Sequence, residues 1–155
     1  MNTINGLPAH PLLVHLVVVA VPVTAVVAIV IALWPRARTA LNAFPAVLGL
    51  LTLIAVPITT SAGESLEKSQ PPTPDLTRHA QLGDQLILAV GPLFGLLALL
   101  YLLQLPAVTG RLPLSDAVIA RIDVAARALT VVAAIASIVM VVLVGDSGAR
   151  SVWGG

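Results

Sequence analysis

Residues 11–34, PLLVHLVVVAVPVTAVVAIVIALW, form an apolar run that contains no Asp, Glu, Lys or Arg. The hydrocarbon core of a bilayer is about 30 Å thick, and about 20 apolar residues in a helix cross it. No Lys or Arg precedes the run, which is also longer than the apolar part of a typical signal peptide. We therefore expect a retained transmembrane helix at about residues 11–34.

Three further apolar runs follow, at about residues 41–62, 76–103 and 117–144. Thr73 and Pro74 suit the N-cap and the first position of the third helix. Hydrophobic residues make up 58% of the chain and charged residues 10%, whereas soluble domains carry about 25% charged residues. The sequence predicts an all-α integral membrane four-helix bundle, up-down-up-down, with residues 1–155 as a single domain.

Composition also excludes several classes of function. The chain has no cysteine, so imidazole and carboxylate groups would have to hold any metal or haem. A net charge of +1 lacks the basic density of a nucleic-acid-binding protein. Neither a hydrolase nucleophile motif nor a glycine-rich phosphate loop is present, and we expect a binding module more than an enzyme.

The charges predict the orientation of the helices. Lys68, Arg78 and Arg150 fall on the side of the bundle that carries both termini. The opposite side holds Arg36, Arg38, Arg111, Arg121 and Arg127. Because cytoplasmic loops carry the excess of Lys and Arg, we expect both termini outside the cytoplasm.

The three histidines fall on this extracytoplasmic side. In an up-down-up-down bundle, the first and third helices are parallel and lie diagonally across the core. His15 and His79 each lie about one turn into their helix, which predicts that they face each other as the two ligands of a haem b. Alternatively, His10, His15 and His79 together hold a transition-metal ion.

Other polar residues on the same side extend this hypothesis. Carboxylates near a ligating histidine orient it or exchange protons with it. The candidates for this role, together with one cation, are Glu64, Asp84, Asp146 and Arg150. A quinone or proton-relay site that uses Glu64, His79 and Asp84 is an alternative. In the structural alternative, the three imidazoles only cap a helix, bond to backbone or face solvent.

Local patterns predict three further details. Gly145 follows the last apolar residues of the fourth run, which predicts a helix stop there, and the alternative is an anion-binding turn of backbone amides at residues 145–148. An ion pair is expected between Asp146 and Arg150. Asp123 and Arg127, four residues apart, are expected to form another.

Four stretches carry a resemblance to a known family. They are GLPAHPLLVH at residues 6–15, SAGESLE at 61–67, Arg78-His79 leading into Gly83-Asp84, and GDSGARSVW at 145–153. With them the chain resembles the bacterial membrane family called domain of unknown function 2231, with matches that include His10, His15, His79, Gly63, Glu64 and Trp153. The resemblance implies a bacterial cytoplasmic membrane and no particular activity.

Some relatives join this module to a Rieske-type iron–sulfur domain, which implies a respiratory setting. The resemblance also implies a histidine at the position of Asp146 in many relatives. We expect an accessory or electron-transfer-associated subunit of a larger respiratory-type membrane complex, or a homo-oligomer, in the lipid bilayer. The alternative is a structural partner without a cofactor.

Overall fold

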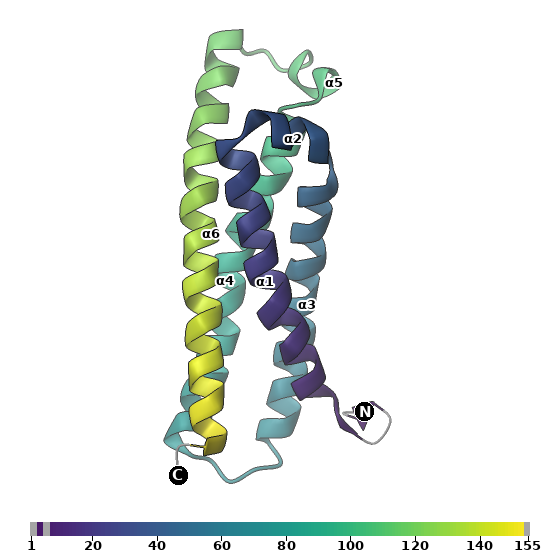
Figure 1. Cartoon of the computed structure of the whole chain (residues 1–155). Coiled ribbons are helices and arrows are strands. Elements are labelled where there is room, and N and C mark those ends of the chain that lie inside the picture. The colour runs from purple at the N-terminus through teal and green to yellow at the C-terminus, as the bar shows by residue number, and fades with distance from the viewer. Residues whose placement is uncertain (1–2, 5–6, 154–155) are drawn as a thin grey trace.

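A computed structural model describes residues 3–4 and 7–153, with the side chains of residue 10 and of residues 12–153. Four long helices run side by side along the molecule (Figure 1). They are α1 (Ala9–Leu33), α3 (Phe44–Glu67), α4 (Pro74–Leu102) and α6 (Asp116–Trp153). Each is long and apolar enough to cross a membrane. The predicted all-α four-helix bundle is confirmed. Two short strands that precede α1, β1 (Thr3–Ile4) and β2 (Leu7–Pro8), pair antiparallel.

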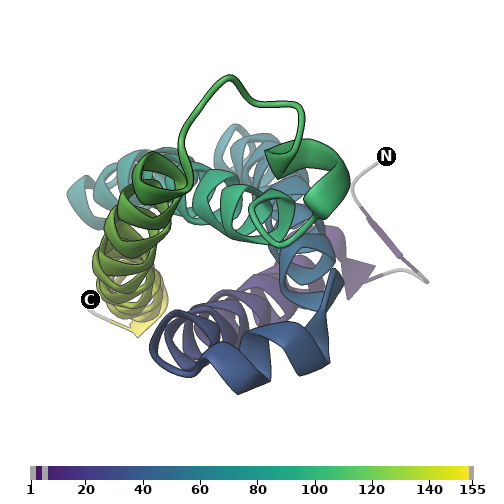
Figure 2. The same ribbon diagram turned by 90° about the horizontal axis from the view of Figure 1, so that it is seen from above.

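The helices follow one another around the bundle in chain order. α1 packs against α3 and α6, and α4 packs against the same two helices, whereas α1 and α4 barely touch. Figure 2, seen along the bundle, shows this ring. The first and third transmembrane helices therefore lie on a diagonal, as the up-down-up-down order predicts.

Two short helices lie at the end of the bundle away from the termini (Figure 1). α2 (Pro35–Leu41) and α5 (Pro106–Thr109) both begin at a proline, which lacks the N–H that a first helical residue leaves unpaired. Asn42 then turns the chain into α3 with a positive φ of 49°, which Asn adopts more readily than most residues. α4 begins as predicted, because the Thr73 hydroxyl accepts a hydrogen bond from the Leu76 N–H at 3.2 Å.

The helices approach closely through small and apolar residues. Ala25, Ala28 and Ala134 have no exposed surface and belong to one buried cluster with leucines of α4. The Thr24 and Thr52 hydroxyls join α1 to α3 by a hydrogen bond of 2.7 Å. Large apolar side chains also point outward, which suits contact with lipid. The most exposed within the spans include Val19, Leu33, Leu88, Val124 and Val132.

The fourth transmembrane helix is longer than the sequence predicted. α6 runs without interruption from Asp116 to Trp153, about 57 Å at 1.5 Å per residue. The predicted helix stop at Gly145 is wrong, and so is the alternative anion-binding turn at residues 145–148. An isolated glycine costs a helix only about 1 kcal/mol, and here contacts with α4 hold this segment.

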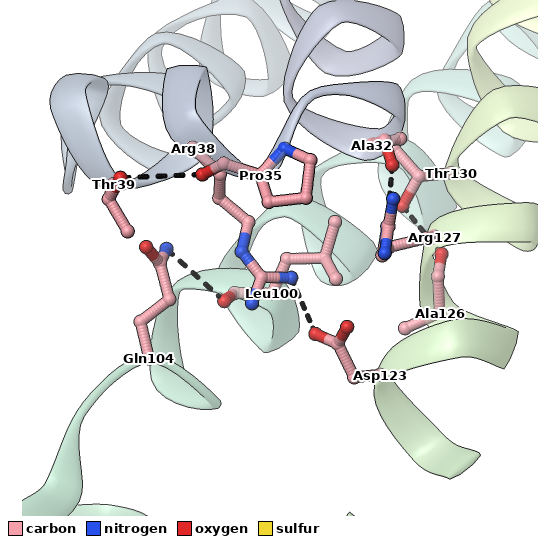
Figure 3. A network of polar contacts seen from close by, with 10 residues as sticks. All are labelled: Ala32, Pro35, Arg38, Thr39, Leu100, Gln104, Asp123, Ala126, Arg127 and Thr130. Carbon is pink, nitrogen blue, oxygen red and sulfur yellow. Dashed lines mark hydrogen bonds and ion pairs between the residues drawn. The ribbon is translucent and has the colours of Figure 1, made fainter. Parts of the chain in front are cut away.

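The predicted ion pair between Asp123 and Arg127 is also corrected. Asp123 pairs with Arg38 of α2, and Arg127 donates from Nε to the Ala32 carbonyl (Figure 3). Both partners of α6 come from the region where α1 ends and α2 begins. The fold thus offers each side chain a partner that spacing along one helix could not indicate.

Candidate functional site

A cavity of about 600 Å³ lies at the end of the bundle that carries the chain termini. Its walls are mainly apolar side chains of all four long helices. Three histidines and three carboxylates add polar groups, namely His10, His15, His79, Glu64, Glu67 and Asp84. The cavity therefore gathers five of the seven predicted site residues, whereas Asp146 and Arg150 do not line it.

His10 and His79 meet across the diagonal of the bundle. Their ring centroids are 6.3 Å apart, and the ring planes make an angle of 72°. The predicted partner of His79 was His15, but this edge-to-face contact is made by His10. Five residues of α-helix turn about 140° beyond a full turn, so His10 and His15 point to different sides of α1. His15 is exposed and lines the cavity from its own side.

The His10 imidazole is anchored on α3. Its Nδ1–H donates to the Thr59 carbonyl at 3.1 Å. Four residues later along α3, Gly63 leaves room for the ring, because a Cβ at that position would lie 2.8 Å from His10 Cε1. The hydrogen bond and the glycine together determine where the imidazole sits.

The His79 imidazole is anchored on α6 in the same way. Its Nδ1 lies 3.1 Å from the Val144 carbonyl and 3.1 Å from Ser147 Oγ. Four residues after Val144, a Cβ on Gly148 would lie 2.9 Å from His79 Cε1. The hairpin of α1 and α3 and the hairpin of α4 and α6 thus build equivalent half-sites, although no internal repeat is evident in the sequence.

These anchors determine which nitrogen of each ring can act as a ligand. A backbone carbonyl only accepts hydrogen bonds, so Nδ1 carries the proton in both imidazoles. In the neutral ring, Nε2 then bears the lone pair. Metal-ligating histidines typically donate their other N–H to a carbonyl or carboxylate in this manner. His10 and His79 have the hydrogen bonding of a ligand pair.

The sequence comparison adds one finding. Residues 6–155 match the family described as predicted membrane protein (DUF2231). The chain belongs to this family. No curated protein and no solved structure matches it significantly. The predicted family is thus confirmed, and this DUF2231 chain is a membrane protein whose matched region contains both histidine half-sites.

Two half-sites do not amount to a larger ligand cluster. Within the part of the DUF2231 chain that the structure describes, no three His, Asp or Glu side chains lie close enough to hold a metal ion together. Glu64 and Asp84 are exposed at the cavity wall.

The predicted ion pair of Asp146 and Arg150 is confirmed at 3.0 Å. Both side chains are more than half exposed, at 57% and 64%. An exposed pair of this type contributes about 0.5 kcal/mol to stability.

Gly63 and Gly148 were not predicted as site residues. The signal in the sequence was a glycine within a small polar stretch near the end of each hairpin's second helix.

Proposed function

We propose that this DUF2231 protein is a haem-binding membrane module in which His10 and His79 would hold a haem b. The observation that carries the proposal is the distance of 6.3 Å between the two ring centroids. Bound haem would supply reversible one-electron chemistry at the iron. The protein's residues would hold the two imidazoles and exclude water.

The distance agrees with the length of two metal–imidazole bonds. Such a bond is about 2 Å long, so two imidazoles whose ring centroids lie about 6 Å apart could both reach one ion. Cofactor sites in helical bundles are built from side chains on facing helices in this way. The diagonal placement of α1 and α4 brings both imidazoles to one cavity, where His10 and His79 would hold the group.

The number of ligands favours haem over a bare ion. A structural zinc site takes four ligands from protein, and a catalytic site takes three. Haem brings four nitrogens of its own, so two histidines complete six-coordination. The paired imidazoles therefore match the requirement of haem, and the three-histidine metal site is the less favoured alternative.

The surroundings of the pair support an apolar cofactor. Small-molecule sites are typically concave, mainly apolar and about 300–1,000 Å³ in volume, and the cavity of about 600 Å³ falls in this range. Apolar walls keep water away from the iron and influence its redox potential. The carboxylates Glu64 and Asp84 at the cavity wall would lower that potential by stabilising the oxidised, more positive state.

A single haem near one membrane surface implies a partner. An electron that reaches such a site has to leave to another carrier, so we place the protein as an accessory, electron-transferring subunit of a larger complex. The distribution of Arg and Lys supports an orientation with the site on the extracytoplasmic side, and the family resemblance implies a bacterial cytoplasmic membrane. The donor and acceptor would then meet the module at the cavity end.

A visible spectrum of the full chain tests the proposal. The protein is expressed with supplemented haem precursor, purified in mild detergent and measured oxidised and dithionite-reduced. We expect the spectrum of a six-coordinate, low-spin b-type haem. His10→Ala and His79→Ala should each abolish it, whereas His15→Ala, in the lining of the same cavity, should preserve it. A colourless wild-type protein, or an unchanged spectrum in both ligand variants, would contradict the proposal.

A quinone site is the second candidate, favoured by one observation. Glu64, His79 and Asp84 line the same apolar cavity and could relay protons to a bound quinone. A colourless protein whose unfolding temperature rises with excess quinone analogue would support this candidate. Co-purification of a complex that survives replacement of all three histidines would instead support a structural partner.

A further inference from the structure

The end of the bundle that carries α2 and α5 differs in charge from the cavity end. It holds five arginines and two aspartates, whereas the cavity end holds three cations and five carboxylates. The arginines are Arg36, Arg38, Arg111, Arg121 and Arg127, and the aspartates are Asp116 and Asp123. This end of the bundle thus carries an excess of positive charge.

One of the five arginines is neutralised within the fold. Arg38 pairs with Asp123, and their side chains are only 16% and 22% exposed. Figure 3 shows this pair beside Arg127, whose own hydrogen bond runs to α1. Asp123 therefore pairs with Arg38, although it lies one turn before Arg127 on the same helix.

Arg127 keeps its positive charge next to the lipid-facing surface. Its Nε donates to the Ala32 carbonyl in the last turn of α1, where carbonyls lose their helical partners. A carbonyl is neutral, so this bond orients the guanidinium without compensating its charge. The guanidinium has further N–H groups that match the oxygens of a phosphate.

A groove of about 260 Å³ lies beside this guanidinium, between the end of α1 and α6. Apart from Arg127 its walls are apolar: Ala32, Leu33, Val124, Ala128 and Val131. Leu33 and Val124 are 67% and 63% exposed. One cation in an apolar groove on a membrane-facing surface is complementary to a molecule with a negative head and an apolar body.

The groove lies at the level of the bilayer where lipid headgroups are expected. Trp34 follows Leu33 and is 64% exposed, and tryptophan prefers the headgroup layer of a bilayer. Further along α6, Val132 and Ile135 are exposed and could contact an acyl chain. We propose that this groove binds an anionic phospholipid, with Arg127 contacting its phosphate. This site is independent of the haem proposal.

Native mass spectrometry of the detergent-purified chain tests the site. The protein is titrated with phosphatidylglycerol, with phosphatidylcholine of the same acyl chains, and with inorganic phosphate. We expect preferential retention of phosphatidylglycerol, and Arg127→Gln should weaken it about fivefold. Arg121→Gln is the matched control, because it removes the same charge from an exposed position of α6 and should preserve the preference.

A second variant tests the groove without altering the charge. Ala128→Phe fills the groove from an exposed position and should reduce phosphatidylglycerol retention even if Arg127→Gln does not fold. Equal retention of the two lipids would overturn the proposal. Inorganic phosphate displacing the lipid would also overturn it, as would an equal loss in Arg121→Gln.

Discussion

His10 and His79 lie edge to face across the bundle diagonal, each held by a carbonyl and a glycine of the helix that follows it in its hairpin. Because both rings are positioned by backbone atoms, their separation depends on how closely α1 approaches α3 and α4 approaches α6. The site should therefore respond to small changes in helix contact, as well as to loss of an imidazole.

The glycines of the half-sites provide a direct test of this dependence. Gly63→Ala and Gly148→Ala would place a Cβ 2.8 and 2.9 Å, respectively, from an imidazole carbon. Overpacking of this kind destabilises a folded protein by about 1–3 kcal/mol. We expect each variant to lose the low-spin haem spectrum or to bind haem more weakly. Gly95→Ala is the control, because nothing lies within 4 Å of that Cβ. A normal spectrum in both half-site variants would argue against positioning by the glycines.

The ion pair of Arg38 and Asp123 should matter more for stability than that of Asp146 and Arg150. The first pair is at most 22% exposed and the second at least 57% exposed. Asp123→Asn leaves a largely buried guanidinium without its counter-charge, so we expect a loss of about 2 kcal/mol. Asp146→Asn should cost about 0.5 kcal/mol or less. Chemical unfolding in detergent measures both, and equal losses would contradict the ranking.

The hydrogen bond between Thr24 and Thr52 joins two transmembrane helices at 2.7 Å. Thr24→Val keeps the shape of the side chain and removes the hydroxyl. Interhelical hydrogen bonds of this kind contribute about 0.6 kcal/mol in membrane proteins. We expect a loss of that size in unfolding free energy. A loss several times larger would indicate that the hydroxyl has a further role.

The orientation can be measured with cysteines, because the chain contains none. Arg150→Cys and Arg111→Cys place one thiol at each end of the bundle, at exposed positions. In intact cells, a membrane-impermeant maleimide should label residue 150 at once and residue 111 only after permeabilisation. The reverse pattern would place both termini in the cytoplasm and contradict the orientation inferred from the arginines.

Much of the fold follows from local sequence. The four apolar runs predict four spanning helices, because the length of a span is set by bilayer thickness and needs no tertiary contact. Thr73 and Pro74 likewise predict the start of α4 through groups within one helical turn. The chain order around the bundle follows from short links. The number of spans likewise predicts that the polar residues of the cavity lie at one end of the bundle. These residues are His10, His15, His79, Glu64 and Asp84.

Tertiary structure decided which groups meet. The angular position of His10 on α1 selected it as the partner of His79, and α2 supplied Arg38 to Asp123 in place of a neighbour on the same helix. Contacts with α4, including those of His79, likewise stabilise α6 beyond Gly145. The sequence by itself determined the membrane class and the spans, because hydrophobicity acts along the chain. The histidine pair and the role of its two glycines depended on helix rotation and approach, which arise only when the four helices pack.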